Sequence, residues 1–179
     1  LEKRVLGKDD KGKKRLLRRV RFVWDGDVLV HELREEAQAA GDPVVEERTY
    51  WFEDEGFEPL AHREKRVDDV GRESGGWFHY VNDPIGTPER LVASDGSVAA
   101  EYRRKAWGEL EALAGARAST PLRLQGQYWD EETGLAYNRW RYYDGAGRFV
   151  RSDPVGLAAS PHAFRFASNA VGWTDPLGL

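Results

Sequence analysis

The chain has 179 residues, of which 40% are hydrophobic, so it is long enough to form one domain with a hydrophobic core. Its formal net charge of −4 excludes an overall attraction to nucleic acid or to an anionic membrane surface. The absence of cysteine excludes disulfides and thiolate chemistry, and no apolar run approaches the ~18 residues of a membrane span.

The composition indicates the fold class. Nineteen glycines, with 12% aromatic and 32% charged residues, are typical of many short, polar-edged strands joined by glycine turns, and not of a packed α/β domain. We therefore expect an all-β protein. The chain has no methionine and begins with Leu1, so we also expect it to be an internal piece of a longer polypeptide.

Residues 3–21 are rich in lysine and arginine. Such a stretch can bind nucleic acid or an acidic partner, but it lacks the interleaved aromatic side chains that stack on bases. A solvated strand face with a turn is the simpler interpretation. Further on, Val20, Phe22 and Trp24 alternate with polar positions and share one face of a strand. Asp25-Gly26-Asp27 then predicts a hairpin turn, after which the chain runs back.

Two further strands follow. The polar, alanine-rich residues 34–42 are either a short helical turn or a loop. Residues 44–52 and 57–63 are predicted to be strands, with Pro59 marking an edge or a bulge. Residues 65–76 are predicted to form a long loop.

His62 is the histidine of the second of these strands. It has no second histidine or carboxylate at metal-ligand spacing, so we expect an ordinary strand or surface histidine. The sequence predicts no metal site and no cofactor site.

From residue 77 onward each unit repeats one plan, an aromatic strand, an Asp/Gly turn and an apolar strand. The turns are Asp83-Pro-Ile-Gly86, Asp95-Gly96 and the one that Tyr143-Asp144 begins. Repeated strand–turn–strand units stack edge to edge, so they predict a wall of strands. Residues 109–114 are either a helical turn or a crossing between strands.

Arginine, glutamine and aromatic residues gather between residues 123 and 141. Such a set suits a sugar site or single-stranded nucleic acid, or it stacks strand on strand with arginines crossing the faces. Alternation along a strand predicts that one face carries Tyr137, Arg139 and Arg141 and the other face carries Asn138, Trp140 and Tyr142. An alternative is that one of these arginines lines a cleavage site.

One pentapeptide pattern occurs twice near the end of the chain, as Asp153-Pro-Val-Gly-Leu157 and Asp175-Pro-Leu-Gly-Leu179. Proline presets φ and glycine tolerates positive φ, so each turn presents its aspartate at a fixed angle. Two carboxylates a few Å apart cannot both ionise, and one that keeps a proton can act with its ionised partner in acid–base chemistry. The alternative is two plain strand-ending turns. Because the chain stops on the motif, we expect a cut there.

Further segments belong with these two motifs: Asp83-Pro-Ile-Gly86, the stretch from Leu122 to Tyr143, Tyr142-Tyr143-Asp144-Gly-Ala-Gly-Arg148-Phe149, and Asn169. Together they resemble the C-terminal core of Rhs (YD-repeat) proteins. That family includes polymorphic toxins of bacterial competition and the C components of insecticidal toxin complexes. The resemblance implies a hollow β-shell, or cocoon, of YD repeats. It also implies an autoprotease plug that cuts the chain and leaves a C-terminal toxin inside the shell.

By position, the resemblance implies that Asp153 and Asp175 are the catalytic aspartates and that the cut follows Leu179. Pro176 and Gly178 are expected to shape the bend at the cut. Arg148 and Arg151 precede Asp153 and are expected to hold its charge or to orient the scissile carbonyl. The family pattern is altered at Asn169-Ala170 and at Ser160-Pro-His-Ala-Phe164.

The same resemblance divides the chain into shell strands, residues 1–76, and a repeat-associated core, residues 77–179. The implied partners are upstream Rhs shell repeats and the chain's own toxin. A secretion spike or chaperone and an immunity protein are further implied partners. Nucleic acid is not among them. The implied setting is a bacterial effector that is secreted or delivered to a target cell, type VI secretion being one route. The alternatives are a purely structural shell cut by another protease and a carbohydrate- or surface-binding module centred on Trp140.

Overall fold

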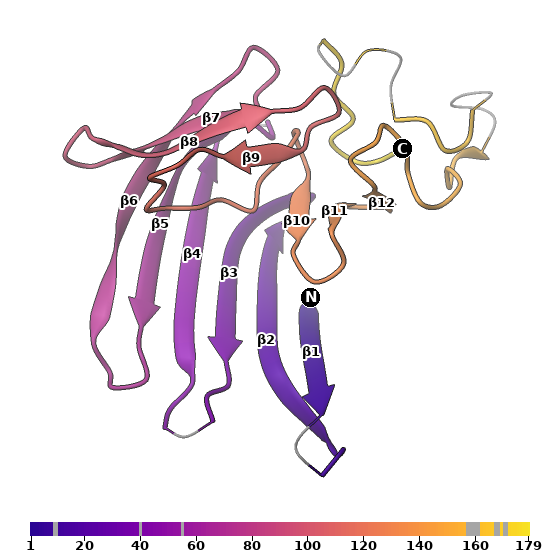
Figure 1. Cartoon of the computed structure of the whole chain (residues 1–179). Helices are drawn as coiled ribbons and strands as arrows, with labels where there is room; N and C mark the ends of the chain where they lie inside the picture. Colours follow the sequence, from indigo (N-terminus) through magenta and orange to yellow (C-terminus); the bar gives the residue numbers. More distant parts are fainter. Residues whose placement is uncertain (9–10, 40, 55, 157–161, 167–168, 170–171) are drawn as a thin grey trace. The chain divides into compact units, whose positions relative to one another are not determined.

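The computed structural model describes residues 1–8, 11–39, 41–54, 56–156, 162–166, 169 and 172–179. Every regular element in this part of the chain is a β-strand, and the described pairings are antiparallel (Figure 1). The all-β prediction is confirmed. Among the described residues no helix is long and apolar enough to span a membrane.

Nine strands form the larger sheet, and neighbours in the sequence are neighbours in the sheet (Figure 1). They are β1 (Glu2–Lys8), β2 (Lys14–Asp25), β3 (Val28–Glu36), β4 (Val44–Phe52), β5 (Pro59–Val67), β6 (Glu73–Asn82), β7 (Pro88–Ala93), β8 (Val98–Arg104) and β9 (Leu110–Ala112). The order β1 to β9 is open, so β1 lies at one edge. An open edge presents unpaired backbone groups that another strand can use.

The N-terminal basic stretch lies on β1 and β2. Arg18 Nη2 lies 2.5 Å from Glu36 Oε1 across the β2–β3 pair, and Arg21 Nη2 lies 3.2 Å from Glu35 Oε1. Val20 is buried and the next residue, Arg21, is exposed, as alternation predicts. This arrangement agrees with the solvated strand face, whose charges are matched by glutamates of the next strand.

The predicted loop over residues 65–76 is wrong. β5 continues to Val67 and β6 begins at Glu73, so the connection is only residues 68–72. Asp68 Oδ1 closes this turn by accepting hydrogen bonds from the N–H groups of Val70 and Arg72. Lys65 Nζ also pairs with Glu73 Oε1 across the strands at 2.9 Å. Serine and glycine had indicated a loop, but ladder hydrogen bonds need only the main chain.

The sequence left alternatives at residues 34–42 and 109–114, and part of each range is strand. β3 runs on to Glu36, inside the alanine-rich connection. β9 occupies Leu110–Ala112 and pairs with β8, with Tyr102 opposite Ala112. The helical-turn alternative for residues 109–114 is therefore wrong.

The smaller sheet consists of β10 (Tyr128–Asp130), β11 (Leu135–Asn138) and β12 (Arg141–Tyr143). Asn138 pairs with Arg141, so the chain reverses at Arg139 and Trp140, and Arg139 has a positive φ of 44°. The predicted alternation is wrong here, because a two-residue turn resets which side chains share a face. Arg141 is buried with Asn138, while Trp140 is exposed.

An aromatic core lies beside this smaller sheet. Tyr143, Phe149 and Phe166 contact one another with ring centroids 5.0–5.8 Å apart, together with Ile85, Leu124 and Ala136. The Tyr143 hydroxyl donates to the Trp107 carbonyl at 2.7 Å. Aromatic pairs at these distances add stability beyond the apolar area they bury.

The described chain separates into two compact units, residues 1–51 with 61–78 and residues 52–60 with 79–179. The division at residue 76 stays a prediction, because compactness does not test which part is shell and which is core. Both Asp-Pro-x-Gly-Leu motifs belong to the second unit.

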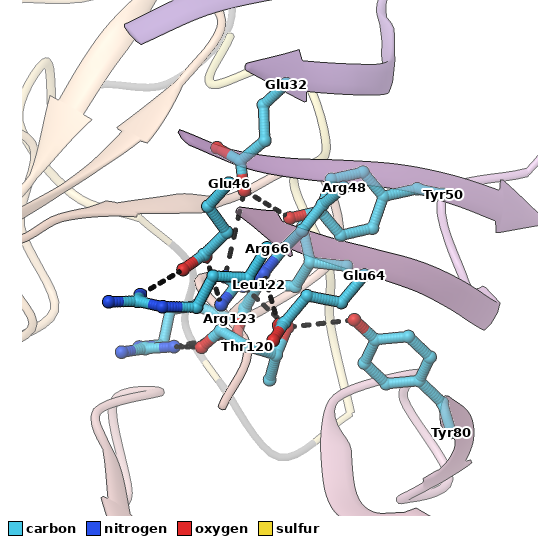
Figure 2. Close-up of polar contacts among 10 residues, drawn as sticks. All are labelled: Glu32, Glu46, Arg48, Tyr50, Glu64, Arg66, Tyr80, Thr120, Leu122 and Arg123. Carbon is cyan, nitrogen blue, oxygen red and sulfur yellow. Dashed lines mark hydrogen bonds and ion pairs between the residues drawn. The ribbon is translucent and has the colours of Figure 1, made fainter. Parts of the chain in front are cut away.

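The first unit contains a buried charged cluster on β3, β4 and β5 (Figure 2). Arg48 lies 2.8 Å from Glu46, 3.0 Å from Glu64 and 3.8 Å from Glu32. The Tyr50 hydroxyl donates to Glu32 Oε1 at 2.7 Å. A buried charge is tolerated only when it is paired and hydrogen-bonded, so the cluster ties three neighbouring strands together.

His62 is fully buried next to this cluster, and its ring lies against Tyr50 and Phe78. Burial, with the nearby Arg48 charge, lowers the pKa of His62 to about 3. The ring therefore stays neutral at physiological pH. It is a strand histidine, as the sequence predicts.

Candidate active site

Aspartates close several turns of this fold in one way. The Oδ1 atoms of Asp68, Asp83 and Asp144 each accept hydrogen bonds from the main-chain N–H groups two and four residues later. The Oδ2 atoms of Asp83 and Asp144 face arginines, Arg104 at 2.8 Å and Arg148 at 3.5 Å. The predicted role of aspartate in the turns is confirmed.

Asp153 begins with the same device. Its Oδ1 accepts from the Val155 N–H at 2.8 Å, and its main-chain N–H donates to the Ala163 carbonyl at 2.9 Å. Its Oδ2 lies 2.9 Å from Arg141 Nη2, and both side chains are almost fully buried. Asp153 is therefore fixed by its own turn on one side and by a guanidinium on the other.

Asp175 departs from this pattern. Its Oδ1 accepts from the N–H groups of Gly178 and Leu179, at 2.9 and 3.1 Å, three and four residues later. Its buried Oδ2 accepts no hydrogen bond from the described residues and lies 3.7 Å from Arg141 Nη2. Burial raises the pKa of Asp175 in spite of the two main-chain hydrogen bonds. This carboxyl group therefore keeps its proton to a higher pH than an ordinary aspartate.

Arg141, the first residue of β12, links the two aspartates. Its Nη2 faces both carboxylates, its Nε donates to the Gly178 carbonyl at 2.7 Å and its Nη1 to the Ala163 carbonyl at 3.2 Å. Its guanidinium carbon lies 3.6 Å from the centroid of the Phe149 ring. One arginine facing two ionised aspartates leaves a net charge of −1, so a single proton on the pair neutralises the site.

The two arginines that the sequence favoured, Arg148 and Arg151, lie elsewhere. The Arg148 side chain is largely exposed and its Nε is 3.5 Å from Asp144, and Arg151 is exposed to solvent. Within the described ranges neither forms an ion pair with Asp153, and Arg141 occupies the predicted position. The sequence offered Arg141 only as one of several arginines that could line a cleavage site, because the turn at Arg139 that carries it to the aspartates has no strong glycine or proline signal.

Other sequence features fall partly outside the described residues. Leu157, which ends the first motif, lies outside them, as do Ser160, Pro161 and Ala170. Asn169 is described, and its carbonyl accepts from the Trp173 N–H at 3.0 Å.

Asp83 shows how much of this geometry is structural. Asp83-Pro-Ile-Gly86 is another Asp-Pro-x-Gly turn, and its buried aspartate also pairs with an arginine. The Asp153–Arg141 pair alone therefore does not indicate catalysis. What distinguishes this site from the turn at Asp83 is a second aspartate, Asp175, beside the same guanidinium, with a buried oxygen that no described donor reaches.

No family model matches the chain. The chain is 36% identical over 172 residues to double-stranded DNA deaminase toxin A of Burkholderia cenocepacia (strain H111), covering 89% of this chain and 12% of that protein. It is 30% identical over 164 residues to a protein named RhsA of Dickeya dadantii (strain 3937), covering 89% and 11%. With toxin protein Tse5 of Pseudomonas aeruginosa (strain PAO1) the identity is 34% over 190 residues, covering 89% and 13%.

Solved structures agree on the fold. The crystal structure of a TcdB2–TccC3–TEV complex superposes with a TM-score of 0.59 and 19% identity, covering 98% of this chain and 10% of that one. The chain thus spans 10–13% of the length of these proteins. The sequence relatives are Rhs-type toxins, and the solved structure shares the all-β architecture. The chain accordingly belongs to the Rhs, or YD-repeat, family of toxin-associated proteins.

Proposed function

We propose that this chain is a single-turnover aspartyl autoprotease that cuts its own polypeptide after Leu179. The observation that carries the proposal is the pair Asp153 and Asp175 on one buried guanidinium, with Asp175 Oδ2 left without a described donor. Two carboxyl groups with different environments are the requirement for dividing acid and base roles between them.

The two environments favour one division of roles. Asp153, 2.9 Å from Arg141, is the ionised partner, and Asp175, whose pKa is raised, is the protonated one. Asp153 takes a proton from water as the water oxygen attacks the Leu179 carbonyl carbon, and Asp175 Oδ2 donates its proton to the carbonyl oxygen. The C–N bond then breaks as Asp153 gives the proton taken from water to the leaving nitrogen, and Asp175 regains a proton from a hydroxyl group of the tetrahedral intermediate. The products are the Leu179 carboxylate and a new amino terminus.

Position also supports the proposal. The Leu179 N–H donates to Asp175 Oδ1 at 3.1 Å, so the residue whose carbonyl group is attacked is bound to the carboxyl group proposed to protonate it. Holding the reacting groups together within one chain replaces a bimolecular encounter and supplies much of the rate.

The wider role is part of the same proposal. The relatives are named as toxins, and one related crystal structure is described as TcdB2–TccC3 without its hypervariable C-terminal region. We infer that upstream repeats continue the sheet from the open edge at β1 and that the segment freed after Leu179 is a toxin held inside the shell. Delivery to a target cell, with a spike or chaperone and an immunity protein, follows from this inference.

A purely structural role is the second candidate. It is favoured by the turn at Asp83, where the same aspartate–arginine geometry closes a hairpin. In that case Asp153 and Asp175 are turn residues of a wall, and another protease makes any cut. Carbohydrate binding through Trp140 stays a prediction.

Intact-mass measurement of a purified precursor with about 20 residues after Leu179 separates the candidates. Self-cleavage predicts two masses split after Leu179 with no added protein, and a single uncut mass for Asp153→Asn and Asp175→Asn. The matched control is Asp83→Asn, which alters an equivalent turn and is expected to be cut normally. If Asp83→Asn blocks cutting as completely as the other two, loss of turn stability explains all three results and the catalytic assignment fails.

A further inference from the structure

The turn that joins β11 to β12, with the last residue of β11 and the first of β12, binds the main chain of residues 175–179. Asn138 Nδ2 donates to the Asp175 carbonyl at 2.9 Å. The Trp140 N–H donates to the Leu177 carbonyl at 3.2 Å, and Arg141 Nε donates to the Gly178 carbonyl at 2.7 Å. Three of the five residues are thus bound through their carbonyl oxygens, by donors from one short turn.

Two glycines allow the close approach. A Cβ on Gly126 would overlap the Pro176 carbonyl group, and a Cβ on Gly178 would lie 2.6 Å from the Asn138 carbonyl oxygen. Both glycines also have positive φ, 78° and 69°. No side chain fits at either position without moving backbone, which is costly.

Asn138 is the side chain that completes this surface. It is fully buried, its Nδ2 is used on the Asp175 carbonyl, and its Oδ1 accepts no hydrogen bond from the described residues. Its Cγ lies 3.4 Å from the position of a Cβ on Gly178. The side-chain amide of Asn138 therefore lies between Asp175, which begins the terminal turn, and Gly178, which precedes Leu179.

These contacts correspond position by position to the motif. Asp175 is held by its carbonyl and supplies the carboxyl group, Pro176 packs against Gly126, and Gly178 has no room for a side chain. Leu177 is held through its carbonyl oxygen, a group that every residue has. The pattern Asp-Pro-x-Gly is what this surface accepts.

We propose that Gly126 and Asn138 are positioning residues of a docking groove, completed by Trp140 and Arg141, that reads Asp-Pro-x-Gly at residues 175–178 through its main chain. The groove delivers the Leu179 carbonyl to the two aspartates. The inference rests on the proposed self-cleavage where it is tested by the rate of cutting. Protection of main-chain amides against hydrogen exchange tests it independently of self-cleavage.

The rate test uses two glycines with the same backbone conformation. Gly134 has a φ of 67° and nothing within 4 Å of the position that a Cβ would take, whereas Gly126 faces Pro176. Gly126→Ala and Gly134→Ala therefore share the cost of positive φ, and only the first blocks the groove. We expect Gly134→Ala to cut at the wild-type rate and Gly126→Ala to cut at least tenfold more slowly. Equal rates for the two variants would overturn the proposal.

The motif itself gives a second comparison. Leu177→Ala is expected to leave the cleavage rate within about twofold of wild type, because only the carbonyl is read. Gly178→Ala is expected to stop cleavage. The reverse order, with Leu177→Ala the more damaging, would contradict main-chain reading.

Asn138 is tested by the pH profile, which a merely structural role does not move. Asn138→Leu removes the donor and is expected to slow cleavage without shifting the profile. Asn138→Asp adds a negative charge beside Asp175 and is expected to shift the profile to higher pH. An unshifted profile in Asn138→Asp, or a wild-type rate in Asn138→Leu, would remove Asn138 from the positioning role.

Hydrogen exchange separates failure of the groove from failure of self-cleavage. The Gly178 and Leu179 amides are expected to be protected in the wild type and in Gly134→Ala, and to exchange faster in Gly126→Ala. If the wild-type precursor stays whole but this order holds, the groove stands and the protease proposal falls. If these amides exchange as slowly in Gly126→Ala as in the wild type, the proposed docking groove is refuted, whether or not the precursor is cut.

Discussion

Replacing Arg141 with lysine tests the centre of the candidate site while keeping its charge. The guanidinium serves two carboxylates and two carbonyl groups with three nitrogens, whereas lysine has one nitrogen and cannot reach all four. Losing one charge-assisted hydrogen bond costs roughly 1.5–3 kcal/mol. If that bond acts in the transition state, cleavage slows roughly 10- to 100-fold.

The assay is the rate at which a purified precursor converts to its two products, followed by intact mass. The matched control is Arg104→Lys, which weakens the equivalent ion pair with Asp83 and is expected to leave the rate unchanged. Arg148→Lys and Arg151→Lys test the arginines that the sequence favoured, and wild-type rates are expected for both. A wild-type rate for Arg141→Lys, or a slow rate for Arg148→Lys, would refute the assignment of Arg141.

Four further predictions concern pH and packing. Because the pKa of Asp175 is raised, cleavage is expected to fall as pH rises through that pKa, and a rate that increases steadily from pH 5 to 8 would contradict its role as the acid. The folded state also binds this proton more readily than the unfolded state, so its stability falls over the same rise in pH, and Asp175→Asn should melt at or above the wild-type temperature at pH 7, by calorimetry. The pKa of His62 is lowered from 6.5 to about 3, so the free energy of unfolding is expected to fall as pH drops below 6.5, by up to ~5 kcal/mol near pH 3. His62→Phe should reduce this dependence of stability on pH, as measured by urea titrations at several pH values. Tyr143→Phe removes the hydrogen bond to Trp107 and should cost about 1 kcal/mol by the same method, whereas no measurable loss would show that this bond is not stabilising.

Much of the architecture could be predicted because it depends on local chemistry. Alternation at Val20, Phe22 and Trp24 and the turn at Asp25-Gly26-Asp27 predicted the β2–β3 hairpin, which the register confirms. Where signals competed, the prediction failed. Ser74 and Gly75 resemble loop residues, yet they lie in β6 because the short turn at Asp68 and the cross-strand pairing decide the register.

The candidate site divides in the same way. Asp153 and Asp175 were identifiable because the turn that presents an aspartate is encoded within five residues. Arg141 could be named only as one of several candidate arginines, since its position depends on a two-residue turn that puts it on the face of Asn138 and against both motifs. Gly126 is far from the terminal motif in sequence, and only packing against Pro176 reveals its role.

Local sequence was enough to predict an all-β chain of aspartate-closed hairpins and two aspartates presented by proline turns, because dihedral preferences and side-chain alternation act over a few residues. Tertiary contacts were needed to show which arginine faces those aspartates and which aspartate keeps a buried oxygen without a described donor. The same is true of the groove for the terminal segment. These features depend on burial and on contacts between residues 12 to 50 positions apart, which no local pattern encodes.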